Sequence, residues 1–193
     1  SNAKVYTVGL YRDGDDTSYV VKTIEKTDEA QINAAVSNYF NEYYVAIASG
    51  TNVEVLSGSF PSSTNETGLK NYVSFSTSQT VKNLSFSPSG QYVFARSGAS
   101  FTSYDLEYKL LFSSIIDGNS NDFAVNWLND NYIWSDRDGD LTIREFDGAN
   151  IHIINKVSAS QGVVITSNGR YIYSVNLLAS GGYQLQRVRI ILQ

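Results

Sequence analysis

The fold is decided by the stretch Asn83–Phe112, NLSFSPSGQYVFARSGASFTSYDLEYKLLF, because it contains one complete structural repeat. Short runs of apolar or alternating residues are each closed by Pro, Gly, Ser or Asp, a pattern typical of strands joined by tight turns. The turns fall at Pro88-Ser89-Gly90 and Gly98-Ala99. The stretch therefore predicts four short strands, at 83–87, 91–97, 101–105 and 109–113.

Weaker copies of this repeat occur along the chain. When the copies are aligned on the aromatic residue that opens the second strand, the separations are 48, 40 and 39 residues, for Tyr44, Tyr92, Tyr132 and Tyr171. A period near 40 residues with four strands is the signature of a β-propeller blade. We expect an all-β protein built of four-stranded antiparallel blades, either about four blades or a partial propeller.

The repeats predict one propeller-like domain over residues 4–193. Residues Ser1–Ala3 are interpreted as the remnant of a cleaved expression tag. The expected blade units are about 4–26 (partial), 29–76, 82–115, 122–155 and 162–193.

A short helix is expected near residues 29–40. Asp28 and Gln31 have the spacing of a capping box, and a helical apolar spacing follows them at Ile32, Ala35, Val36, Tyr39 and Phe40. The alternation of Ile32, Ala34 and Val36 also fits a strand, so this alternative stays open.

The last unit has almost no residues left for a fourth strand after Arg189. Two solutions are considered for closing the propeller. Thr17–Glu25 could pair with the C-terminal blade, or a second copy or another region of the protein could complete it. A monomer or a homodimer is therefore expected.

Composition excludes several classes of function. The net charge is −5 and no run of basic residues occurs, so nucleic acid and anionic membrane surfaces are poor partners. The chain has no cysteine, which removes disulfides, thiolate catalysis and zinc–thiolate sites. No apolar run approaches the ~18 residues of a membrane span, and no cofactor is expected.

The motif Phe86-Ser87-Pro88-Ser89-Gly90, followed by a short apolar strand, a Gly turn and Tyr104-Asp105, resembles a degenerate WD40-type blade. Phe146-Asp147 has the same place in the next unit. The Gly-His pair of WD40 repeats is absent from every unit, and Trp is absent from the position before Asp, so the resemblance is to propellers broadly.

Residues 83–193 also resemble, more loosely, the propeller segments of bacterial envelope proteins that carry a PEGA domain upstream. The similar phrases are Leu84–Gly90, Trp127–Ser135 and Arg144–Gly148. This resemblance brings no catalytic residue. It implies display and binding rather than turnover, and a cell-envelope or extracellular location.

Two constellations suggest chemistry. Asp136, Asp138 and Asp140 alternate like the carboxylates of a calcium loop, but the sixth position, where such a loop needs Gly, is Leu141. A plain Asp-Gly hairpin is favoured, with a weak cation site as the alternative. His152 is the only histidine and has neither a Gly-x-Ser-x-Gly elbow nor a cysteine to act with, so we expect an ordinary strand residue.

Four tyrosines lie outside the repeat-equivalent positions and are the candidate binding surface: Tyr11, Tyr43, Tyr108 and Tyr183. We expect a non-enzymatic binding or scaffolding module, part of a larger protein, that presents its loops to a protein or glycan partner. The alternative is a propeller hydrolase or lyase that acts on polysaccharide through clustered carboxylates.

Overall fold

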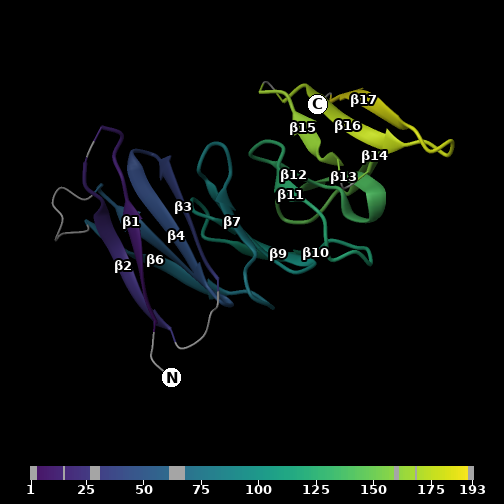
Figure 1. Cartoon of the computed structure of the whole chain (residues 1–193). Coiled ribbons are helices and arrows are strands. Elements are labelled where there is room, and N and C mark those ends of the chain that lie inside the picture. Colours follow the sequence, from purple (N-terminus) through teal and green to yellow (C-terminus); the bar gives the residue numbers. More distant parts are fainter. Residues whose placement is uncertain are drawn as a thin grey trace. The chain divides into compact units, whose positions relative to one another are not determined.

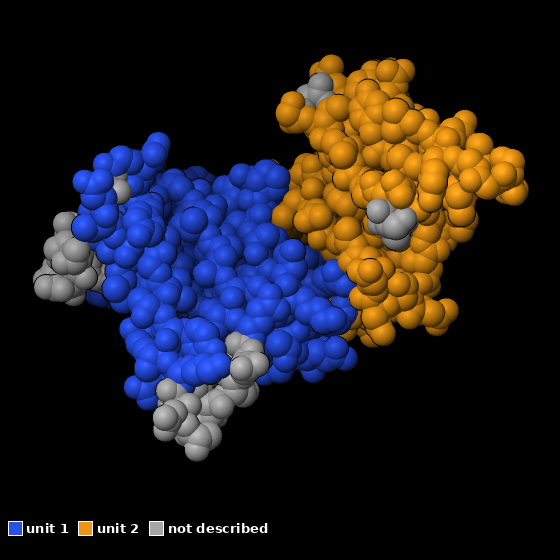
Figure 2. All heavy atoms as spheres, in the orientation of Figure 1, with its two compact units in different colours: residues 1–98, 104–109 blue, residues 99–103, 110–193 orange. Residues whose placement is uncertain are grey.

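A computed structural model describes residues 4–14, 16–26, 31–60, 68–158, 161–167 and 169–190. These residues form antiparallel β-sheets, and one turn of 3-10 helix, η1, occurs among them at Arg137–Gly139. Within the described ranges we find no helix of the length and apolarity needed to traverse a bilayer. The chain divides into two compact units, residues 1–98 with 104–109 and residues 99–103 with 110–193 (Figure 2).

The first unit contains a two-stranded and a four-stranded sheet (Figure 1). The two-stranded sheet pairs β1 (Lys4–Leu10) with β2 (Tyr19–Lys26). The four-stranded sheet follows chain order, with β3 (Ile32–Tyr39), β4 (Glu42–Ser49), β5 (Asn52–Gly58) and β6 (Leu69–Ser76).

The strand β4 is buried on both faces. Val45 and Ile47 pack with Val21, Leu56 and Leu69 in a core that also takes apolar side chains of β1 and β2. The intervening residues Tyr44, Ala46 and Ala48 turn to the other face, where they belong to two clusters that include Val93 and Ala95 of the next sheet. Successive side chains of a strand point to opposite faces, so one strand supplies two cores, as a blade between two neighbours requires.

The expected helix near residues 29–40 is wrong where the structure describes this segment. Residues 32–39 form β3, which pairs with β4 over its whole length, from Ile32 opposite Ser49 to Tyr39 opposite Glu42. Phe40 and Asn41 both have positive φ, as the two-residue hairpin turn demands. The long-range ladder to β4 outweighs the local helical spacing. Residues 29 and 30 lie outside the described residues.

The next sheet has the order β10-β9-β8-β7 and contains the repeat that decides the fold. Its strands are β7 (Asn83–Phe86), β8 (Tyr92–Ser97), β9 (Ser100–Asp105) and β10 (Leu111–Ile115). Gly90 closes the turn after β7 at φ +87°, and a Cβ there would lie 2.9 Å from the carbonyl oxygen of Asn38. Glycine is thus required both by the backbone conformation and by the close approach of the turn to the end of β3.

The second unit contains a four-stranded and a three-stranded sheet. The first consists of β11 (Val125–Trp127), β12 (Tyr132–Ser135), β13 (Asp140–Glu145) and β14 (His152–Lys156). The second consists of β15 (Val163–Ile165), β16 (Tyr171–Leu177) and β17 (Tyr183–Arg189). The two sheets share a core in which Ile172 of β16 packs with Trp134, Leu141 and Ile143.

Thr17–Glu25 is one of the two candidates for completing the C-terminal blade. This segment contributes β2, whose partner is β1, in a sheet of two strands. In the part of the chain that the structure describes, the C-terminal sheet has three strands.

Repeat-equivalent or alternating apolar positions in the sequence predict burial between blades for eight residues: Phe86, Tyr92, Phe94, Trp134, Ile143, Phe146, Ile172 and Leu185. Tyr92, Phe94, Trp134, Ile143 and Ile172 are buried, and Phe86 and Phe146 are half-buried. Leu185 is 70% exposed, so its predicted burial is wrong. It lies on β17, at the edge of the three-stranded sheet. There, the alternation of apolar and polar residues does not by itself place another layer of protein over the apolar side chains.

We predict that Phe94→Ala lowers the free energy of unfolding by about 3–5 kcal/mol, because the ring is 1% exposed and its removal leaves a cavity in the central strand β8. Urea unfolding followed by circular dichroism measures this change. Tyr11→Ala, at a side chain that is 70% exposed, is the matched control and should change stability by less than about 0.5 kcal/mol. Equal effects of the two substitutions would contradict the packing.

Four tyrosines cluster in the first unit: Tyr39 of β3, Tyr44 of β4, Tyr72 of β6 and Tyr104 of β9. Tyr44 meets Tyr72 edge to face with ring centroids 5.6 Å apart, and Tyr104 stacks on Phe75. The Tyr72 hydroxyl donates to the Leu106 carbonyl at 2.6 Å. Burial, followed by the nearby Glu42 carboxylate, raises the pKa of Tyr44 to about 12. The pKa values of Tyr72 and Tyr104 are raised as well, again mainly by burial.

This cluster predicts alkaline destabilisation. An unfolded tyrosine loses its proton near pH 10, whereas folded Tyr44 keeps it to about pH 12. The stabilisation is therefore complete below pH 10 and is lost as the pH rises from 10 to 12. Urea unfolding at pH 9 and pH 11 should show a loss that is smaller by roughly 1 kcal/mol in Tyr44→Phe. The exposed Tyr108→Phe is the control, and identical pH profiles for Tyr44→Phe and the unsubstituted chain would contradict the prediction.

Candidate functional site

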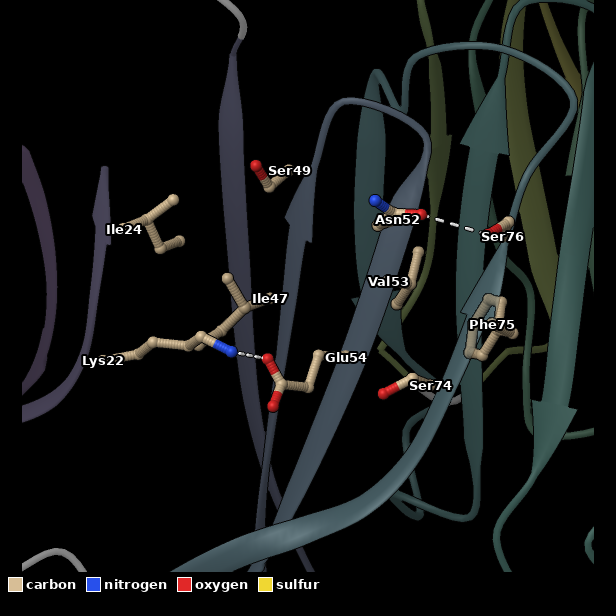
Figure 3. Close-up of a pocket in the computed structure, with 10 residues that line it drawn as sticks. All are labelled: Lys22, Ile24, Ile47, Ser49, Asn52, Val53, Glu54, Ser74, Phe75 and Ser76. Carbon is tan, nitrogen blue, oxygen red and sulfur yellow. Dashed lines mark hydrogen bonds and ion pairs between the residues drawn. The ribbon is translucent and has the colours of Figure 1, made fainter. Parts of the chain in front are cut away.

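The candidate site is a hollow of about 430 Å³ in the first unit, between β2 and one face of the β4–β6 strands (Figure 3). Lys22 and Ile24 of β2 form one side. The other side is formed mainly by Ile47 and Ser49 of β4, Asn52 and Glu54 of β5, and Ser74 and Ser76 of β6. This volume lies within the range of about 300–1,000 Å³ typical of small-molecule sites.

The hollow forms where the apolar packing between the two sheets ends. Farther along the strands, Val21, Val45 and Leu56 fill the space between the layers. Toward the β4–β5 turn, the inward positions carry serine and asparagine, which are too small to fill a gap between sheets spaced ~10 Å apart. The bulge between Val55 and Leu56 marks a local irregularity in the ladder from β5 to β6.

One pair of opposite charges crosses the hollow. The Lys22 ammonium donates to the Glu54 carboxylate, and Figure 3 shows the two side chains reaching toward each other from opposite sides. The second oxygen of Glu54 accepts from the Asn71 side-chain amide at 3.1 Å. This amide also donates to the Ser74 hydroxyl at 2.9 Å. The carboxylate is therefore oriented by two donors while one side of it still faces the hollow.

The rest of the lining combines hydroxyl groups with apolar surface. The Ser76 hydroxyl donates to the Asn52 side-chain oxygen at 3.1 Å near the β4–β5 turn. Ile24 and Ile47 lie across from each other on the apolar side (Figure 3). A site with both kinds of surface and no net charge suits a small ligand that has hydroxyl groups on one side and C–H groups on the other.

The four tyrosines of the predicted binding surface are exposed, but none lines the hollow. Tyr43 meets Phe60 edge to face at 5.4 Å, and the guanidinium of Arg12, the neighbour of Tyr11, lies 4.6 Å above the Phe60 ring. Tyr108 lies three residues after Asp105, and the backbone N–H of Tyr108 donates to the Asp105 carboxylate at 3.1 Å. Tyr183 lies on β17 in the second unit. Binding by these residues stays a prediction.

The three aspartates of the candidate metal loop each bind different partners. Asp136 accepts from the Ala124 N–H at 2.6 Å, and Asp140 pairs with Lys156. Asp138 accepts from the N–H groups of Asn119 and Ser120 at 2.6 and 2.7 Å, and these bonds lower its pKa. No group of three potential metal ligands converges anywhere in the described ranges. The loop is the turn between β12 and β13.

Two buried arginines fix the segment that precedes β11. Arg137 donates through Nε to the Ser120 carbonyl at 2.8 Å and through Nη1 to the Ile116 carbonyl, with its guanidinium 4.8 Å from the Phe123 ring centre. Arg144 donates to the Ile115 carbonyl at 3.0 Å, and burial lowers its pKa. We interpret both as structural because their donors satisfy backbone carbonyls.

Sequence reasoning missed Lys22 and Glu54. Both are charged residues within strands that are otherwise apolar, next to Val21 and between Val53 and Val55. A charge at an inward position of a strand is the signal that could have marked them. Their partnership could not be read, since they are 32 residues apart and meet only when β2 packs on the sheet of β5.

Comparison with known proteins gives similarity in structure alone. No protein-family model matches the chain, and a search of curated proteins finds no relative. Among solved structures, a candidate 6-phosphogluconolactonase from Bacteroides fragilis is 11% identical over 95% of this chain, with a TM-score of 0.55. The chain spans 65% of that protein, which is less than two thirds of its length.

Two further structures are less similar. A candidate 6-phosphogluconolactonase from Bacteroides uniformis is 15% identical, covers 93% of this chain and 59% of its own, and has a TM-score of 0.47. A functionally unknown protein from Desulfotomaculum acetoxidans is 13% identical, covers 96% and 79%, and has a TM-score of 0.43. The comparison supports a propeller-type, all-β fold with four-stranded antiparallel sheets and favours neither WD40 repeats nor PEGA-domain proteins.

The similarity also corrects the functional expectation. A non-enzymatic binding or scaffolding module was expected, because the resemblance to the propellers of PEGA-domain envelope proteins implied display and binding rather than turnover. That expectation was wrong, since the same fold is that of a candidate hydrolase. A propeller fold leaves the reaction to be argued from the site.

Proposed function

We propose that this chain belongs to a propeller hydrolase that opens a small, uncharged sugar lactone, and that the hollow between β2 and the β4–β6 strands binds this substrate. The observation that carries the proposal is the Lys22–Glu54 pair in a hollow otherwise lined by hydroxyl, amide and apolar groups. The names of the structural neighbours support the reaction class, lactone hydrolysis.

The two charged groups have complementary roles in this reaction. The Glu54 carboxylate accepts a proton from water as the oxygen attacks the ester carbonyl. The Lys22 ammonium stabilises the negative charge that forms on the carbonyl oxygen. The ring C–O bond then breaks, the departing oxygen takes the proton held by Glu54, and the product is a hydroxy acid with Glu54 again ionised. Substrate entry must separate the ion pair, which places one charge on each side of the ester.

The charge of the hollow sets the substrate class. Its lining carries one cation and one anion, Lys22 and Glu54. A phosphate group brings a charge of about −1.5 to −2 and is bound best by several cationic or N–H donors. Here it would lie beside the Glu54 carboxylate. We therefore propose an unphosphorylated lactone, in contrast to the substrate in the name of the first neighbour.

We also propose that the blades are built like degenerate WD40 repeats. The support is Asp105, whose carboxylate accepts from the N–H groups of Glu107 and Tyr108 and closes the turn after β9. Asp147 accepts from the Ala149 N–H in the next unit. The resemblance to PEGA-domain envelope proteins rests on sequence phrases alone.

We predict that the chain accelerates hydrolysis of D-glucono-1,5-lactone, followed by pH-stat with the spontaneous rate subtracted. Glu54→Gln keeps the size of the side chain but removes the base, so the catalysed rate should fall by about 10²–10⁴-fold. Glu25→Gln, on the exposed side of β2, is the matched control and should keep the rate. The 6-phosphorylated lactone should be the poorer substrate.

Binding is tested separately with the unreactive lactam analogue, by calorimetry. Lys22→Met should abolish its binding, whereas Lys70→Met, at an exposed lysine of β6, should not. Lactam binding that survives Lys22→Met, or a catalysed rate that survives Glu54→Gln, would contradict the assignment of the site. Lack of any acceleration together with lack of lactam binding would contradict the proposed function as a whole.

A further inference from the structure

The sheet of β15, β16 and β17 carries an edge that is suited to strand addition. In the described residues this sheet has three strands, with β17 at one edge. A strand at an edge presents unpaired N–H and C=O groups and acts as a template for another strand. The character of this edge is set by the groups that β17 turns outward.

The hydrogen-bond pattern shows which residues of β17 direct their backbone N–H and C=O groups away from β16. The Ile190 N–H donates to the Arg170 carbonyl, and the Leu178 N–H donates to the Gly182 carbonyl, so these opposite residues are hydrogen-bonded pairs. Such pairs alternate along an antiparallel ladder with pairs that make no hydrogen bond to each other. In the register of β16 with β17, the odd-numbered residues of β17 therefore direct their N–H and C=O groups to the edge.

The same odd-numbered residues carry exposed side chains. Tyr183 is 62% exposed and Leu185 is 70% exposed, and Arg187 and Arg189 are exposed as well. The alternate residues Gln186 and Val188 are half-buried on the opposite face of the sheet. An added strand would thus meet two apolar side chains followed by two guanidinium groups on one face.

The charge along the chain is strongly divided. All 19 acidic residues lie at or before Asp147, and residues 148–193 contain none. That last segment holds Lys156, Arg170, Arg187 and Arg189. No carboxylate of β15–β17 competes for the two arginines of β17, and the guanidinium of Arg187 lies 5.1 Å from the Tyr171 ring centre.

We propose that the edge of β17 binds an extended acidic segment of a partner protein as a fourth, antiparallel strand. The backbone of the segment continues the ladder of β16 and β17, which is the β-augmentation mode of peptide recognition. Residues directly opposite each other share a face of the sheet. The antiparallel segment therefore carries two acidic residues, opposite Arg189 and Arg187, followed by two apolar residues opposite Leu185 and Tyr183.

The probe is a fluorescein-labelled peptide, Glu-Thr-Glu-Thr-Val-Thr-Val, titrated with the full chain and followed by fluorescence anisotropy at low salt. We expect saturable binding that weakens when salt is raised. Arg187→Gln combined with Arg189→Gln should weaken binding roughly tenfold, because two exposed ion pairs are lost. Arg189→Gln alone should give a smaller effect in the same direction and avoids the contact of Arg187 with Tyr171.

Three controls separate strand addition from simple charge attraction. The reversed sequence, Val-Thr-Val-Thr-Glu-Thr-Glu, has the same charge but mismatches the side chains in the antiparallel register and should bind more weakly. A version N-methylated at the second glutamate and the first valine, which lie opposite Arg187 and Leu185 and point their N–H groups at β17, cannot complete the ladder and should not bind. Arg12→Gln removes an exposed arginine of the first unit and should leave the affinity unchanged.

Several outcomes would overturn the proposal. Equal affinity for the forward and reversed peptides, or retained binding of the N-methylated peptide, would exclude a registered strand. Binding that survives neutralisation of both arginines would exclude the acidic partner. Polygalacturonate binding that depends on the arginines, without peptide binding, would assign the surface to an anionic glycan. A dimer seen by ultracentrifugation that is lost in the double variant, again without peptide binding, would assign the edge to a second copy.

Discussion

The first unit depends on the burial of β4 on both of its faces. Val45 and Ile47 pack toward β1 and β2, while Ala46 and Ala48 pack toward β7 and β8. Near the end of β3 the neighbouring sheet comes close enough that a Cβ at Gly90 would lie 2.9 Å from the Asn38 carbonyl oxygen. A strand with two cores cannot shift its register by one residue without exchanging both sets of side chains. The positions of Lys22 and Glu54 follow from this fixed register.

The sequence predicted the features that depend on short stretches. The tyrosine spacing correctly marked the second strand of the later three repeats: Tyr92, Tyr132 and Tyr171 are the first residues of β8, β12 and β16. These signals are local, since turn residues and alternation act within a few residues. The helix expected near residues 29–40 failed because its local spacing competed with an eight-residue ladder to β4, which no local pattern contains.

The site was far less predictable than the fold. The exposed tyrosines were chosen because they broke the repeat, yet the hollow lies where the lining keeps strand alternation and changes only from apolar to polar residues. Ser49, Asn52 and Ser76 look like ordinary turn-flanking residues in the sequence. Their importance comes from β2 lying across from them, and this packing is a tertiary event. The Lys22–Glu54 pair is likewise visible only once two sheets have packed.

The first sheet along the chain, β1 and β2, and the last strand, β17, differ in charge. This difference separates the two proposed roles, lactone hydrolysis and strand addition. The sheet of β1 and β2 covers one face of β4–β6 and contributes a lysine whose charge is balanced within the hollow by Glu54. On β17, Arg187 and Arg189 are exposed in a segment without carboxylates. A balanced charge inside a hollow favours a neutral small molecule, whereas uncompensated charge along a strand edge favours an extended acidic chain. The two proposed surfaces, one inside a hollow and one along a strand edge, therefore call for ligands of different size and charge.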